Sequence, residues 1–346
     1  MVSIHPGHSV SDSFHIHHMN NIFRLTLATS LFCALTTPLP AKQESASPQK
    51  DHSSFLRSDY YVWNRFEKQG GPNAEQIKNI EVLIFFSPLV PDAKGKLTVD
   101  RKFEEALAKL KKAKSPKSQI WLGLGDLRAV SKNKQATDTL AKETVNLCKK
   151  YGFTGVDIDW EGNDDIPANV YADVLKSLSA ACRKAKLAIA NSVGTGPHYI
   201  AKSAAVQPYL DHINIQFYYS TRNAMSVNET KQVLDRFEKA GVPRRKLMIG
   251  LPVYGMVDMQ KNRNAKPTAL GYNFMISKGA KPNENTWVNP ENGATYYYSG
   301  QPLIRSKVDF AKKNGYGGVF TWELTMDAPY SSPQSILRVL DEACKR

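Results

Sequence analysis

Short apolar segments alternate with helix-like segments over most of the chain, and this alternation is the strongest constraint on its fold. The apolar segments are rich in β-branched and aromatic residues, which is typical of buried strands. Eight strand–helix units in about 290 residues fit a single (β/α)8 TIM barrel. We expect the strands at residues 59–63, 82–87, 119–123, 155–161, 187–192, 212–219, 247–254 and 318–324.

The segments between these strands have the spacing of amphipathic helices. Val170, Val174 and Leu178, for example, recur along one helical face. A doubly wound α/β sheet is the competing fold, and it would require a glycine-rich phosphate loop after an early strand. Residues 123–125 contain two glycines of such a loop and lack the third. We therefore favour the barrel.

One connection is much longer than the others. It lies between the seventh and eighth expected strands, at about residues 256–300, and contains Trp287 and three consecutive tyrosines. Connections that follow the strands lie at the end of a barrel where active sites are built. We expect a small inserted subdomain or lid there.

The N-terminal region has the pattern of a secretory signal. A basic and then apolar run follows Met19 and ends at the small residue Ala41. We interpret residues 1–41 as an upstream extension plus signal peptide, residues 42–57 as a flexible linker and residues 58–346 as the barrel domain. An uncleaved anchor is the alternative, but the run is short for a membrane span. We expect a secreted protein, extracellular or periplasmic, with no stable membrane span after cleavage.

The formal net charge of +14 raises the question of nucleic-acid binding. Most lysines fall on helix-like segments such as 109–114 and 142–150, which favours a solvated basic surface. Attraction to anionic polymers is the alternative. We expect a monomer without a nucleic-acid partner.

The four cysteines are too few for a disulfide scaffold, and no C-x-x-C pair is present. Cys33 lies in the expected leader. Cys148 and Cys182 lie on apolar helical faces, and Cys344 lies near the end. These three are expected to be buried free thiols, or else Cys148 and Cys182 form a bridge in an oxidising compartment.

A row of acids is the strongest chemical signal. Asp157, Asp159 and Glu161 alternate with apolar residues, so they share one face of the expected strand, directed into the barrel. Buried acids are costly unless they share protons or meet a ligand. Mutual repulsion predicts that Glu161, nearest the end of the strand, keeps a proton and can act as a general acid. A solvated edge strand and a metal site are the alternatives. We expect neither metal nor cofactor, because no histidines cluster near the row.

This row resembles the D-G-x-D-x-D-x-E signature of family 18 glycoside hydrolases, the chitinase family, with Thr154 in place of the first Asp. The resemblance extends from residue 59 to about residue 341. Tyr219 stands where the family often has Asp or Asn, and the third strand lacks its usual serine. Further resemblances, in the family's order, are residues 60–63 to its first strand, 120–125 to its S-x-G-G strand, 216–218 to its Q-x-Y motif and 317–323 to its last strand, with Asp327 following.

The resemblance implies hydrolysis of β-1,4 linkages between N-acetylglucosamine units by substrate-assisted, retaining catalysis. Glu161 would be the acid, Asp159 would orient the 2-acetamido group, Asp157 would hold Asp159, and Tyr218 would donate to the acetamido oxygen. The residues expected to contact substrate are Trp322, Gln216, Tyr219 and Tyr60. Trp121 and Trp287 are interpreted first as core residues.

The implied partner is chitin, a chitooligosaccharide or another glycan that contains N-acetylglucosamine. An endo-β-N-acetylglucosaminidase that cuts the chitobiose core of N-glycans is the alternative enzyme. A non-catalytic chitin-binding lectin is a third possibility, which the presence of Glu161 disfavours.

Overall fold

Eight parallel strands form a closed barrel in a computed structural model that describes residues 55–218, 224–262 and 268–345. The order around the barrel is β1-β12-β7-β6-β5-β4-β3-β2. The predicted (β/α)8 TIM barrel is therefore confirmed. The strands are β1 Leu56–Val62, β2 Val82–Leu89, β3 Gln119–Leu124, β4 Gly155–Ile158, β5 Ala188–Val193, β6 His212–Ile215, β7 Leu247–Pro252 and β12 Gly318–Trp322.

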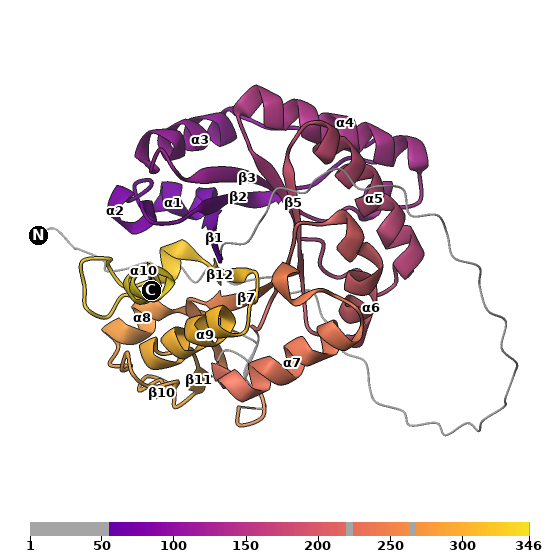
Figure 1. The fold of residues 1–346 in the computed structure, drawn as a ribbon. Coiled ribbons are helices and arrows are strands. Elements are labelled where there is room, and N and C mark those ends of the chain that lie inside the picture. Colours follow the sequence, from indigo (N-terminus) through magenta and orange to yellow (C-terminus); the bar gives the residue numbers. More distant parts are fainter. Residues whose placement is uncertain (1–54, 219–223, 263–267, 346) are drawn as a thin grey trace, which may run out of the picture. The chain divides into compact units, whose positions relative to one another are not determined.

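Helices surround the barrel, as Figure 1 shows for α3 to α7. Helix α5 illustrates the reason, because it buries Val174 and Leu178 on the predicted face. The α-helices are α1 Trp63–Lys68, α2 Ala74–Ile77, α3 Arg101–Ala113, α4 Lys134–Tyr151, α5 Ala168–Lys184, α6 Pro197–Val206, α7 Val227–Lys239, α8 Tyr272–Ser277, α9 Gln301–Lys313 and α10 Ile336–Lys345. Short 3-10 helices are η1 Arg128–Val130, η2 Gln207–Tyr209, η4 Arg244–Lys246 and η5 Leu324–Met326.

Five of the eight barrel strands end earlier than the sequence predicts, including the first, which ends at Val62, and the last, which ends at Trp322. The segment expected to run to Glu161 ends at Ile158, and the segment expected to run to Tyr219 ends at Ile215. The seventh strand ends at Pro252. The apolar–polar alternation continues past these points because it also marks loop residues that cover the barrel mouth, so it overestimates strand length.

The predicted insertion between the seventh and eighth barrel strands contains a four-stranded antiparallel sheet in the order β10-β11-β8-β9. Trp287 is buried there and packs on Tyr296, with ring centroids 5.9 Å apart. Trp287 is thus a core residue of the insertion. The strands are β8 Tyr254–Val257, β9 Ala269–Gly271, β10 Thr286–Val288 and β11 Thr295–Tyr297.

A tryptophan inside the barrel explains the glycine at the start of β4. Trp121 is buried in the apolar cluster that fills the barrel, which also contains Phe320 and Met248. A β-carbon at Gly155 would lie 2.7 Å from the Trp121 ring, closer than side chains approach one another. Glycine therefore lets the fourth strand pass beside the indole.

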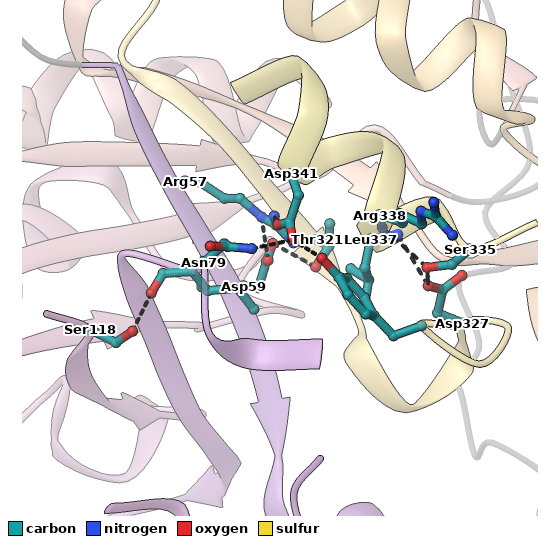
Figure 2. A network of polar contacts seen from close by, with 12 residues as sticks. Arg57, Asp59, Asn79, Ser118, Thr321, Asp327, Ser335, Leu337, Arg338 and Asp341 are labelled. Carbon is teal, nitrogen blue, oxygen red and sulfur yellow. Dashed lines mark hydrogen bonds and ion pairs between the residues drawn. The ribbon is translucent and has the colours of Figure 1, made fainter. Parts of the chain in front are cut away.

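The seam between the first and last strands is fastened by a buried polar network (Figure 2). Arg57 Nε on β1 donates to Asp59 Oδ2 at 2.8 Å, and its Nη1 donates to Asp341 on α10. Thr321 Oγ1 on β12 donates to Asp59 Oδ1 at 2.7 Å. Asn79 Nδ2 donates to Asp341 Oδ2 at 2.7 Å. The network joins β1, β12 and the C-terminal helix, so it stabilises barrel closure.

Asp327, which follows the last strand, binds the start of α10. Its carboxylate accepts from the backbone N–H groups of Ile336 at 2.9 Å and Leu337 at 3.1 Å, and from Ser335 Oγ at 2.5 Å (Figure 2). The contacts of Asp327 are those of a helix cap.

Cys148, Cys182 and Cys344 are free thiols, and the first two are fully buried. The alternative of a Cys148–Cys182 bridge is therefore not what the structure contains. Within residues 55–218, 224–262 and 268–345, no helix has the length and apolar character needed to cross a membrane.

Lys307 is a buried charge that weakens this fold. It lies fully buried on α9, and its Nζ has no hydrogen-bond partner among the residues that the structure describes. Burial lowers the pKa of Lys307 to about 7, and the nearby Glu229 opposes this shift. The folded chain therefore binds fewer protons than the unfolded chain between pH 7 and the ordinary lysine value of 10.5.

We expect Lys307→Met to raise the melting temperature at about pH 6, and to raise it less at about pH 9.5. Below the folded-state pKa the full cost of burying the ammonium is present, and it fades as pH rises and the unfolded lysine also loses its proton. Calorimetry at both pH values checks this, with the exposed Lys313→Met as control. A lower melting temperature for Lys307→Met at the acidic pH would contradict it.

Candidate active site

Asp157 is the buried centre of the site. It is the next-to-last residue of β4, near the barrel mouth. Its side chain has no exposed surface. Tyr60 on β1 donates to its Oδ2 at 2.5 Å, Asn214 on β6 donates to its Oδ1 at 3.0 Å, and Ser192 on β5 donates at 3.2 Å. Burial raises the pKa of Asp157 to about 6, while the hydrogen bonds from these three residues oppose the rise. Three other strands thus supply donors to one carboxyl group.

Asp159 lies one step nearer the mouth and is half-buried. Its backbone N–H donates to the Leu124 carbonyl at 2.8 Å, and its Oδ1 accepts from Gln216 Nε2 at 3.1 Å. Burial raises the pKa of Asp159 well above its usual value, repulsion from Glu161 and Asp157 adds to the rise, and the Gln216 hydrogen bond opposes it. Asp159 therefore holds a proton more tightly than a solvated aspartic acid, and among its neighbours the charge of Glu161 contributes most.

Glu161 lies beyond the end of the strand with an exposed side chain, which corrects the prediction that all three acids point inward from one strand. Two tyrosines lie within its electrostatic reach. Burial, with the Glu161 charge adding to it, raises the pKa of Tyr199 to about 12 and raises the pKa of Tyr254. The result is an accessible carboxyl group beside a half-buried one and a fully buried one.

The residues between the acids lie on the opposite side, as predicted. Trp160 is fully buried, and its ring stacks on Tyr171 with centroids 4.9 Å apart. This packing anchors the chain against α5.

Aromatic side chains lie beside the acids at the mouth of the barrel. Trp322, at the end of β12, is half-buried, and its ring lies 4.9 Å from that of Tyr60 and 5.5 Å from that of Phe86. Tyr218 is 2% exposed, and its ring lies 6.0 Å from that of Tyr254. Trp322 therefore offers an apolar surface at the mouth.

Two of the expected substrate contacts lie under the acids instead. Tyr60 has no exposed surface and donates to Asp157, because the first strand directs it into the barrel core. Gln216 is buried and donates to Asp159. Tyr219 lies outside the described residues. The contacts of Tyr60 and Gln216 are therefore with carboxyl groups.

Ser192 and Asn214 are site residues that the sequence reasoning missed. Each is a buried polar residue in a barrel strand and faces the barrel, which is the signal that could have revealed them. Thr154 lies at the opposite end of β4, where its Oγ1 donates to Gln119 Oε1 at 3.1 Å. The hydrogen bonds of its side chain are with β3.

Among the residues that the structure describes, no group of three or more His, Cys, Asp or Glu side chains could hold a metal ion.

The sequence model of the Glycosyl hydrolases family 18 matches residues 58–327, which span the barrel and every residue of the acid row. The chain belongs to this family. This family 18 chain is 24% identical over 269 residues to Endochitinase 1 of Metarhizium robertsii. The alignment covers 63% of this chain and 62% of that protein. It is 25% identical over 253 residues to a class V chitinase of Medicago truncatula, covering 58% and 66% of the two chains. The matched region thus spans less than two thirds of these relatives.

Solved structures share the fold of this family 18 chain. The chitinase ChiB of Flavobacterium johnsoniae superposes with a TM-score of 0.68 at 18% identity, covering 84% of this chain and 94% of that one. A class V chitinase of Nicotiana tobaccum, solved in complex with NAG4, superposes with a TM-score of 0.67 at 17% identity, covering 85% and 99%.

We expect Asp159→Asn to raise the melting temperature at about pH 8 and to change it little at about pH 4. The folded-state pKa of Asp159 lies above its ordinary value, so folding takes up a proton and stability falls as pH rises above about 4. Asparagine stays neutral and removes this loss. Calorimetry at the two pH values measures it, with the exposed Asp173→Asn on α5 as control. An equal shift at both pH values would disprove the role of the buried charge.

Proposed function

We propose that this family 18 protein hydrolyses β-1,4 linkages between N-acetylglucosamine units in chitin or chitooligosaccharides. The observation that carries the proposal is the graded burial of three neighbouring acids, from the fully buried Asp157 through Asp159 to the exposed Glu161. The names of the Metarhizium and Medicago relatives support chitin as the substrate.

Glu161 is the general acid in this proposal. Its side chain reaches solvent, so it can approach a glycosidic oxygen, and repulsion between Glu161 and Asp159 favours retention of a proton by the pair. Glu161 donates that proton to the departing sugar and later recovers one from the attacking water.

The nucleophile comes from the substrate. Asp157 is fully buried and hydrogen-bonded to three side chains, so it cannot reach an anomeric carbon. Asp159 lies beside the acid and is bonded to Gln216. The 2-acetamido oxygen of the substrate therefore attacks the anomeric carbon as the glycosidic bond breaks, forming an oxazolinium ion that water then opens. Family 18 is an exception to the scheme with two enzyme carboxylates.

The remaining residues orient this intermediate. Asp159 accepts the acetamido N–H and stabilises the positive charge, and Asp157 holds Asp159 in place. Tyr218 donates to the acetamido oxygen, and Trp322 lies under the sugar. Tyr60 acts through Asp157, to which it donates. Tyr219 remains a proposed substrate contact.

Hydrolysis of the chitobiose core of N-glycans is the alternative that needs a direct test. Parallel assays of the purified protein on chitooligosaccharides and on a high-mannose glycoprotein distinguish the two substrates. Binding of chitooligosaccharides without cleavage of either substrate would instead indicate a lectin.

We expect Glu161→Gln to fold normally and to lose about 10²- to 10⁴-fold in turnover, the typical effect of a lost general acid. Hydrolysis of chitotetraose, with circular dichroism to verify folding, measures this. Glu342→Gln on the outer helix α10 is the control. Wild-type turnover in a folded Glu161→Gln protein would remove Glu161 from the mechanism.

Cleavage should require the acetamido group of the sugar on the non-reducing side of the cut, because that group is the nucleophile. On partly deacetylated chitin, the new reducing ends should be N-acetylglucosamine and almost never glucosamine. Early products should have the β anomer. Product sequencing and proton NMR measure these outcomes, and frequent glucosamine at the reducing ends, or an initial α anomer, would refute substrate assistance.

We also propose that the protein is exported and begins near Lys42 after cleavage of its leader. The basic and then apolar run from Arg24 to Leu39 supports this. Mass spectrometry of the protein made by its own cells should find a start near Lys42, and an intact leader on a cytosolic species would contradict export.

A further inference from the structure

The Asp159 N–H still donates to the Leu124 carbonyl on β3, but the carbonyl groups around Glu161 are bound by side chains rather than by the sheet. Because β4 ends at Ile158, the carbonyl groups that follow must find other donors. The Ile158 carbonyl accepts from Asn191 Nδ2 at 2.7 Å, the Trp160 carbonyl from Asn163 Nδ2, and the Gly162 carbonyl from Arg128 Nη2. The carbonyl oxygens of Trp160 and Gly162, the residues before and after Glu161, are therefore each bound to a side chain.

Lys202 holds the residue on which this arrangement depends. It lies on α6, is 3% exposed, and donates through Nζ to Asn163 Oδ1 at 2.6 Å and to the Asn163 backbone carbonyl. Its Nζ also lies 5.5 Å from the ring centroid of Tyr171. Asn163 is itself fully buried. We call Lys202, Asn163 and the Trp160 carbonyl the lysine clasp.

Burying an ammonium group opposes folding, and Lys202 carries this cost. Burial lowers the pKa of Lys202, and the charges of Asp164 and Asp165 oppose the shift. Arg128 also contacts this loop, but its pair with Asp165, at 2.8 Å, is exposed, and exposed ion pairs contribute little. The clasp is therefore a buried anchor of the Glu161 backbone.

We propose that Lys202 is a positioning residue for the reaction. It acts through Asn163 to fix the backbone at Glu161 and thereby the orientation of the Glu161 side chain. This rests on the proposed role of Glu161 as the acid. The rival explanation is that Lys202 only joins α6 to the barrel. Misplacing a catalytic group by about 1 Å can lower the rate by about 100-fold, so the two explanations differ in turnover rather than in stability.

The chain provides a matched control in Lys246. It is 6% exposed, donates through Nζ to the Gln207 carbonyl at 2.5 Å, and burial lowers its pKa to about 8. It lies in η4, directly before β7, and therefore at the end of the barrel opposite the acids. Lys246→Met removes the same kind of contact far from Glu161.

The test compares Lys202→Met with Lys246→Met on chitotetraose, well below both melting temperatures. We expect both to lower stability, but only Lys202→Met to lower kcat, by at least about tenfold with KM within about twofold. Lys202→Arg, which retains charged donors, should recover kcat to within about threefold of wild type. Wild-type kcat in folded Lys202→Met, or an equal kcat loss in Lys246→Met, would overturn the proposal.

Asn163→Asp tests the clasp without depending on the folding of Lys202→Met. The variant keeps an oxygen acceptor for Lys202 but removes the N–H donor to the Trp160 carbonyl. We expect a melting temperature near that of wild type and a kcat at least about tenfold lower. Wild-type kcat in this variant would also overturn the proposal.

A binding measurement separates positioning of the acid from a general distortion of the substrate site. Glu161→Gln and the double variant Glu161→Gln, Lys202→Met should bind chitotetraose with the same Kd, measured by calorimetry. Weaker binding by the double variant would overturn the positioning role. Full activity of Glu161→Gln alone would instead refute the proposed function, so the two failures are distinct.

Discussion

The burial of Asp157 inside the barrel is the constraint on which the rest of the site depends. A carboxyl group without contact with water must find donors within the protein, and only neighbouring strands can supply them at that depth. Tyr60, Ser192 and Asn214 do so from β1, β5 and β6. Closure of the barrel brings these strands around β4, so the seam held by Arg57 and Asp341 indirectly supports the acid pair.

The end of β4 divides the site into two parts with different physical support. Asp157 belongs to the sheet, where register determines its neighbours. Glu161 belongs to a loop, where side-chain donors replace the ladder of hydrogen bonds. A loop can carry an exposed acid toward a polymer, but it positions that acid only if its own backbone is fixed. The lysine clasp meets this requirement from α6, an element distant in sequence.

Several ionisable groups are buried in this chain, and burying a charge opposes folding. Burial lowers the pKa of Lys307 and raises the pKa values of Asp157 and Asp159, so it favours the neutral form of each group. Asp157 and Asp159 belong to the proposed site, whereas Lys307 does not. Raised carboxyl pKa values are what an acid–base site needs. The cost at Asp159 thus accompanies its proposed role, while the cost at Lys307 has no catalytic counterpart in the structure.

The sequence by itself determined the barrel, the insertion and the acid row, because periodicity and local spacing specify which residues form strands and which side chains share a face. It overestimated β4, because alternation does not show where a neighbouring strand ends. Only the tertiary structure decided that Tyr60 and Gln216 lie beneath the acids, and that Ser192 and Asn214 donate to Asp157. It also decided that Lys202 donates to Asn163 in the loop that follows Glu161. These contacts join residues far apart in the chain, and barrel register and helix packing, which no local pattern encodes, bring them together.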